Sequence, residues 1–207
     1  MSDQKEQMEV FLDFLSNQPK NDQTRWGYRE LLRHRFEERL SDSVERIWEL
    51  PAVLLSKPNA EYLTLLLEAR QLYLDGYFYS CVAMCGIVGE RLIKDVFRAC
   101  VLVQKNGHPQ VPAETAFDQF EHVEVSGIIK FLEKADLLSP EAASAATKLG
   151  EVRNRYVHAR GKEPDSDALR SIKFLHTLIE GTVSVMKDFE FKDGALVRKT
   201  NSPESKS

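Results

Sequence analysis

The segment EVRNRYVHARG, residues 151–161, holds three side chains that could act on a phosphodiester: Arg153, Asn154 and His158. A histidine takes up and releases a proton near neutral pH, and the planar fork of an arginine matches the oxygens of a phosphate. In cleavage of RNA by its own 2′-hydroxyl, His158 would transfer protons, Arg153 would stabilise charge on phosphorus and Asn154 would orient the substrate or the ring. This reaction needs no metal, and DNA lacks the hydroxyl that it requires.

The spacing of these residues predicts how they lie on a helix. Asn154 and His158 are four positions apart and share a face, whereas Arg153 and His158 are five apart and diverge by about 140°. The three converge best if the helix ends near His158, and Gly161 supports such an end. A solvated helix end explains the same residues, because basic side chains in a last turn stabilise a helix through its dipole.

A single histidine serves as general base or as general acid, but not as both in one step. A twofold dimer that brings two copies of the motif together would supply the second proton-transfer group. It would also double the local basic cluster in a protein whose net charge is -4. This cluster comprises Arg153, Arg155, Arg160 and Lys162, set against Glu151 and Glu163.

Composition limits the function classes. The 207 residues, 43% of them hydrophobic, are enough for one main domain with small extensions. A sequence pI near 5.8 argues against a protein that coats nucleic acid, so an RNA contact must be local. No apolar run reaches the roughly 20 residues of a membrane span. The polar N-terminus and three cysteines predict a cytoplasmic protein with reduced core thiols (Cys81, Cys85 and Cys100), and no ligand spacing indicates a metal or cofactor.

The periodicity predicts an all-α fold, because scarce glycine and proline separate segments of helical rather than alternating pattern. We expect a short amphipathic stretch at 8–15 and a polar connection at 104–115. A hairpin around Asp193 and Gly194 and a disordered tail should follow the last helix. The helices are expected at 24–50, 60–75, 77–103, 124–138 and 139–158. A last helix should begin after a cap at Asp165 or Ser166 and end near residue 189.

The RNRYVH motif at 153–158 resembles the signature of the HEPN domains (higher eukaryotes and prokaryotes nucleotide-binding), in which an Arg beside a polar residue precedes a His. The helix GYFYSCVAMCGIVGERLIKDVF, which carries Glu90, is similar to a long helix of a bacterial branch of that family. The resemblance spans roughly residues 60–187. It implies an antiparallel helical bundle, usually dimeric, with the Arg and His sets facing one another.

This resemblance implies a metal-independent endoribonuclease in a toxin–antitoxin, stress or phage-defence system, with RNA or a nucleotide as ligand and a protein partner encoded nearby. Other family members are inactive, so a nucleotide-binding or docking module is the alternative. Two departures stand out: Gly86 replaces a frequent Arg, and Arg160 replaces the Tyr of the toxins paired with nucleotidyltransferases. The second departure argues against an antitoxin-regulated toxin.

The supporting residues have structural explanations as well. Glu90, on a mostly apolar helix, is expected to pair with Arg153 or Arg155 or with a helix terminus, since a carboxylate in such a place is costly without a partner. Tyr156 is expected in the core or an interface, with stacking on a base as the alternative.

The sequence predicts three regions. An N-terminal helical extension should cover 1–55, a HEPN-like bundle 60–188, and a hairpin with a tail 189–207. In the extension, Arg25, Arg29 and Arg33 recur every four residues. This indicates a solvated helix face with ion pairs, or alternatively a stripe that binds RNA or a partner.

Overall fold

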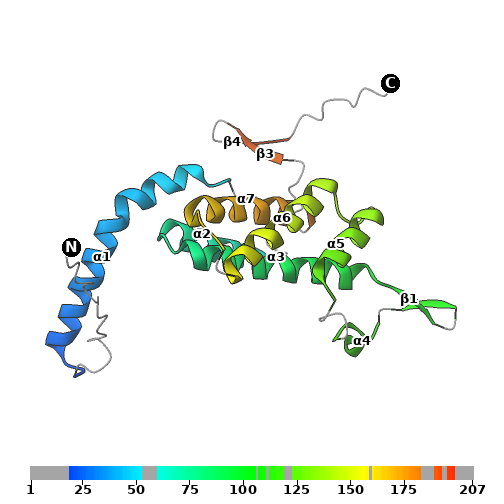
Figure 1. Cartoon of the computed structure of the whole chain (residues 1–207), viewed down its shortest axis with the longest axis horizontal. Helices are drawn as coiled ribbons and strands as arrows, with labels where there is room; N and C mark the ends of the chain where they lie inside the picture. The colour runs from blue at the N-terminus through cyan, green and yellow to red at the C-terminus, as the bar shows by residue number, and fades with distance from the viewer. Residues whose placement is uncertain are drawn as a thin grey trace, which may run out of the picture. The chain divides into compact units, whose positions relative to one another are not determined.

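The structure, a computed structural model, describes residues 19–52, 60–105, 107–110, 112–118, 123–158, 160–182, 189–192 and 195–198. Most of these residues are helical, so the all-α prediction is confirmed (Figure 1). The described residues form α1 (Asp22–Glu49), α2 (Ala60–Leu74), α3 (Phe78–Cys100), β1 (Val103–Lys105), β2 (His108–Gln110), α4 (Glu114–Asp118), α5 (Val125–Lys134), α6 (Pro140–Val157), α7 (Pro164–Thr182), β3 (Phe189–Lys192) and β4 (Ala195–Arg198).

The chain divides into two compact units between Ser41 and Asp42, inside α1. The sequence placed the end of the extension near residue 55. The division lies earlier because the last turns of α1 are bonded to the turn after α2: the Ser43 hydroxyl and the Arg46 guanidinium donate to the carbonyl oxygen of Leu74 at 2.7 and 2.8 Å.

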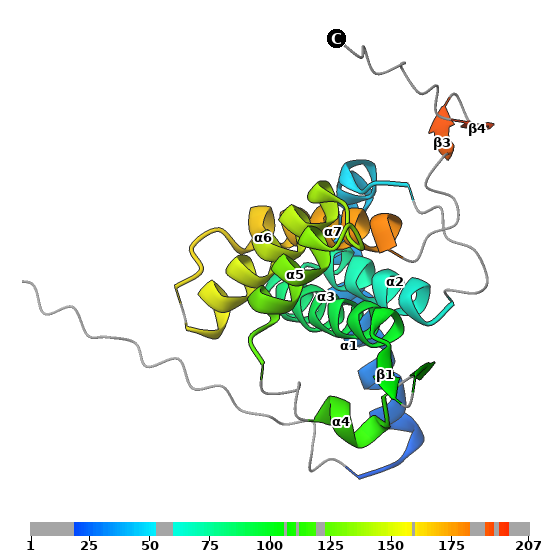
Figure 2. The same ribbon diagram turned by 90° about the vertical axis from the view of Figure 1, so that its right-hand side faces the viewer.

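Three helices, α3, α6 and α7, pack against one another and form the centre of the second unit. Helix α2 packs on α3 and α7, and α5 packs on α3 and α6 (Figure 2). Helix α3 therefore contacts four helices, in agreement with its predicted central place. The largest fully buried side chains of this core are Leu66, Val82, Val88, Leu92, Ile93, Leu132, Leu149, Ile172, Leu175, Leu178 and Ile179.

The two ends of α6 agree with the sequence analysis. The Ser139 hydroxyl accepts a hydrogen bond from the backbone N–H of Ala142 at 3.2 Å, and Pro140 occupies the first turn, where its missing N–H costs nothing. The helix ends with His158 as its C-cap. The predicted cap of α7 is wrong: this helix begins at Pro164, so Asp165 lies within its first turn.

The connections differ partly from expectation. Residues 104–115 were expected to be a polar connection, but β1 and β2 pair as an antiparallel hairpin there, and α4 follows. Gly107, with a φ of +81°, turns the chain between the strands, which an Asn-Gly pair favours. The predicted C-terminal hairpin is confirmed, since β3 pairs with β4 in antiparallel register. The expected helix at 8–15 and the tail at 199–207 lie outside the described residues.

Two further expectations concern the whole chain. Cys81 and Cys85 are buried free thiols as predicted, whereas Cys100 is exposed, because it is the last residue of α3 and lies beyond the core. In the described part of the chain, no helix combines the length and the apolar character that a membrane span needs.

Candidate functional site

Arg153 and Glu90 form an ion pair between α6 and α3. The Nη2 of Arg153 donates to the Oε2 of Glu90 at 2.9 Å, and both side chains are partly buried. Lys94, one turn along α3, approaches the other oxygen of Glu90 at 2.9 Å. Of the partners expected for Glu90, namely Arg153, Arg155 or a helix terminus, the structure shows Arg153.

Gly86 explains how Arg153 reaches Glu90. A Cβ at Gly86 would lie 2.4 Å from the Cγ and 2.7 Å from the Cβ of Arg153, so the stem of this arginine occupies the space that any other residue would need. One turn later, a Cβ at Gly89 would lie 2.5 Å from Leu149. The missing side chain at Gly86 therefore lets a cation from α6, Arg153, join Lys94 of α3 in pairing with Glu90.

A groove of about 470 Å³ lies between α3, α6 and the start of α5. Glu90, Arg153 and Asn154 line it together, and the buried Ile93 and Ile129 are among the other lining residues. The Nε of Arg153 is buried there and has no hydrogen-bond partner among the described residues. An unsatisfied buried donor costs about 1–3 kcal/mol, so this rotamer of Arg153 is not fully stabilised by the chain itself.

His158 is not among the residues that line this groove. Its side chain is exposed at the C-cap of α6, where its backbone N–H donates to the carbonyl oxygen of Asn154 at 3.2 Å. Asn154 is exposed as well, one turn earlier on the same side of the helix. Asn154 therefore lines the groove together with Arg153 and shares the exposed side of α6 with His158. Arg153 and His158 do not lie in one groove.

The other basic residues of the motif have different roles. Arg155 donates to the Oδ1 of Asp167 on α7 at 2.9 Å, so its charge is already paired. Arg160 is exposed just beyond the helix, where its backbone N–H donates to the carbonyl oxygen of Arg155 at 2.7 Å. Of the four basic residues expected to attract a phosphate, Arg153 and Arg155 are thus held by carboxylates, which weakens the local positive potential.

Tyr156 belongs to the core side of the motif, as expected. Its hydroxyl donates to the Oδ2 of Asp167 at 2.8 Å, and its ring meets Tyr79 edge to face with centroids 5.1 Å apart. A Cβ at Gly161 would lie 2.5 Å from the Tyr156 ring, so the chain after α6 folds back over this ring. Burial, followed by the hydrogen bond to Asp167, raises the pKa of the Tyr156 phenol.

Asp167, the carboxylate that organises this region, was not predicted from the sequence. It is 3% exposed and also accepts from the Nη2 of Arg170 at 2.6 Å. The spacing indicates its burial, because Asp167 is four residues before Ser171 and eight before Leu175, both on the buried face of α7. A carboxylate in that phase requires positive partners.

No known family, curated protein or solved structure matches this chain. The resemblance to HEPN domains therefore rests on the sequence motif and the Glu90 helix. Within the described ranges, no cluster of three or more histidine, cysteine, aspartate or glutamate side chains could hold a metal ion.

Proposed function

We propose that this chain is a cytoplasmic, metal-independent endoribonuclease of HEPN type that acts as a homodimer. The observation that carries the proposal is the end of α6, where Asn154 and His158 are exposed on one side and Arg153 reaches the adjoining groove. A toxin, stress or phage-defence setting, with a protein partner encoded nearby, would suit such an activity.

The reaction breaks one bond of the RNA backbone and forms another. His158 accepts the proton of the 2′-hydroxyl, the 2′-oxygen bonds to phosphorus, and the bond to the 5′-oxygen breaks. A proton from the His158 ring of a second copy completes the departing 5′-hydroxyl, so the products are a 2′,3′-cyclic phosphate and a 5′-hydroxyl. Asn154 orients the substrate beside these groups.

Arg153 stabilises the pentavalent phosphorus through its guanidinium. In the resting chain its Nη2 is bound to Glu90, while its Nε has no acceptor among the described residues. A turn of the side chain towards Asn154 would exchange the Glu90 contact for phosphate oxygens, and Lys94 would remain to neutralise Glu90. The charge of Glu90 is therefore compensated in both positions of Arg153.

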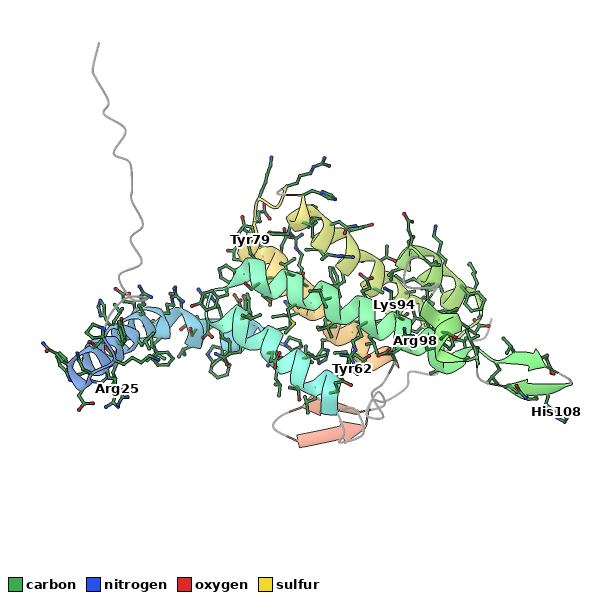
Figure 3. The ribbon with its side chains drawn as sticks, turned by 90° about the horizontal axis from the view of Figure 1, so that it is seen from below. Arg25, Tyr62, Tyr79, Lys94, Arg98 and His108 are labelled. Atoms are coloured by element: carbon green, nitrogen blue, oxygen red, sulfur yellow. The ribbon has the colours of Figure 1, made fainter. Side chains whose placement is uncertain are left out.

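The dimer is proposed because one chain does not assemble the site. Exposed apolar side chains lie on both helices that the Arg153–Glu90 pair joins: Tyr79 and Ile87 on α3 and Val157 on α6. Figure 3 shows Tyr79 near the start of α3 and Lys94 farther along the same helix. A second copy that covers this surface would bring its own α6 end to the site and bury these apolar groups.

One observation favours a second candidate, a non-catalytic module that binds a nucleotide or a protein through the same groove. Arg153 and Arg155 already form ion pairs with Glu90 and Asp167, which is the arrangement expected of residues that hold helices together. In this case His158 would be an ordinary C-cap residue.

Incubation of the purified chain with mixed RNA in EDTA separates the two candidates. We expect cleavage by the wild type, its loss by about 100-fold or more in His158→Ala, and no loss in His108→Ala. His108 is a matched control because it is also exposed, on the β1–β2 hairpin (Figure 3). If wild type and both variants are equally inert while remaining dimeric, the endoribonuclease proposal fails and the binding module is retained.

A further inference from the structure

Helix α1 has no buried residue among its 28. Six large apolar side chains follow one another along it at intervals of three or four residues, or in direct succession, and each is at least 44% exposed. We call them the outer stripe of α1: Leu32, Phe36, Leu40, Val44, Ile47 and Trp48. Such spacing is the pattern of a helix that packs against another element, yet nothing among the described residues buries these side chains.

The last turns of α1 contact the rest of their unit through a different side of the helix. Ser43 and Arg46 donate to the carbonyl oxygen of Leu74, and Glu49 accepts a hydrogen bond from the hydroxyl of Tyr73. Arg46 also lies over the ring of Phe78, 5.1 Å from its centroid. Val44 and Trp48 are each two positions from Arg46, so these two side chains of the stripe point away from the contact that Arg46 makes with Leu74.

The charges of α1 are segregated along its length. Residues 22–35 carry four arginines and two carboxylates, and residues 36–49 carry five carboxylates and two arginines. The first half is therefore positive by two charges and the second half negative by three. Two parallel copies would place like charges together, whereas two antiparallel copies would place each positive half against a negative half.

We propose that the outer stripe of α1 is a self-association surface, on which α1 of a second copy lies antiparallel. The occupant is a second copy because the charge pattern of α1 is complementary to itself when reversed. The negative half argues against an anionic membrane or an RNA backbone along the whole stripe, since both repel carboxylates. This contact differs from the α3–α6 surface of the proposed enzyme dimer and does not depend on RNA cleavage.

Sedimentation velocity of the full chain, over a range of concentrations, tests the proposal. The double variant Phe36→Asp, Leu40→Asp is expected to lose the α1 contact. Ile87→Asp on α3 is the matched control, since Ile87 is 61% and Phe36 62% exposed. Both variants alter exposed side chains, so their helical circular dichroism should equal that of the wild type.

The two surfaces give different oligomers. If both operate, the wild type is larger than a dimer, each variant is a dimer and the combined variant is a monomer. If only the α1 surface operates, the wild type and Ile87→Asp are dimers and the α1 variant is a monomer; the dimer of the proposed enzyme then fails while this proposal holds. An α1 variant with the wild-type mass at every concentration overturns the self-association of α1, even if it binds anionic vesicles less well.

A charge exchange tests the antiparallel orientation. Arg29→Glu with Arg33→Glu makes the first half of α1 negative, and Glu38→Arg with Glu45→Arg makes the second half positive. Each pair alone should weaken association, and all four substitutions together should restore it, because reversed halves are again complementary in an antiparallel pair. Added salt should diminish these differences. Failure of the fourfold variant to regain association overturns the antiparallel arrangement.

Discussion

The guanidinium of Arg153 binds the carboxylate of Glu90 at 2.9 Å, and its stem passes through the space left by the missing side chain of Gly86. One arginine thus joins α6 to α3 and lines the groove beside Asn154. The position of Arg153 therefore depends on a glycine 67 residues earlier in the chain.

Gly86→Ala is expected to destabilise the fold. The added methyl group would meet the Arg153 stem at 2.4 Å, and overpacking of this kind costs about 1–3 kcal/mol. Gly150→Ala, in the interior of α6, is the matched control, because a Cβ there has nothing within 4 Å. It should stabilise the fold by about 0.5–1 kcal/mol, as alanine favours helix. Urea unfolding of both variants measures these changes, and a shift of the same sign in both would refute the role of Gly86.

Asp167→Asn should be among the most destabilising conservative substitutions in the chain. The Asp167 side chain is 4% exposed and receives Arg155, Arg170 and the hydroxyl of Tyr156. We expect a loss of about 2–3 kcal/mol in the free energy of unfolding, less than for a fully buried pair because both arginines are about half exposed.

Glu163→Gln is the control for Asp167. Its carboxylate is 70% exposed and lies 3.7 Å from Arg170, so the loss should stay below about 0.5 kcal/mol. Equal effects of the two substitutions in urea unfolding would show that Asp167 does not organise the end of α6.

Local features of the fold were predictable from neighbouring residues. Ser139 and Pro140 specify the start of α6, and the His158 C-cap and the pairing of β3 with β4 also follow from residues close in the sequence. Glu90 was predicted to pair with Arg153 or Arg155, but which of the two reaches it was not predictable, because the arginines are two positions apart and turn towards different helices. Only the packing of α6 between α3 and α7 decides which carboxylate each arginine reaches.

The outer stripe of α1 is a second feature whose partner the sequence does not predict. A helix was predicted at 24–50, and α1 forms there. Periodicity shows that a helix has an apolar face, but it does not show what covers that face. The burial of Asp167, by contrast, was predictable, because Asp167 is one turn from Ser171 on the buried face of α7.

Stability should decline at alkaline pH through three tyrosines. Tyr62, Tyr73 and Tyr156 each donate a hydrogen bond to a carboxylate, and burial followed by that bond raises the pKa of each phenol above its ordinary value near 10. A raised pKa in the folded state means that this stabilisation is complete below pH 10 and is lost as the pH rises further.

The measurement is the free energy of unfolding as a function of pH. Above a pH of about 10 the wild type should lose stability, and Tyr156→Phe should lose it less steeply because one titrating group is gone. A wild-type stability that stays level while the exposed tyrosines ionise would contradict the assignment of these phenols to carboxylate partners.

The central claim is that the end of α6 cleaves RNA through the 2′-hydroxyl, and the most direct measurement compares two oligonucleotides of one sequence in EDTA under single turnover. One is RNA, and the other is the same RNA with a single 2′-deoxyribose at the main cleavage position. We expect the RNA to give products with 2′,3′-cyclic phosphate and 5′-hydroxyl ends, and the deoxy-substituted strand to stay intact at that position. Cleavage of both strands at the same position, or of neither by the assembled wild-type oligomer, would contradict the account.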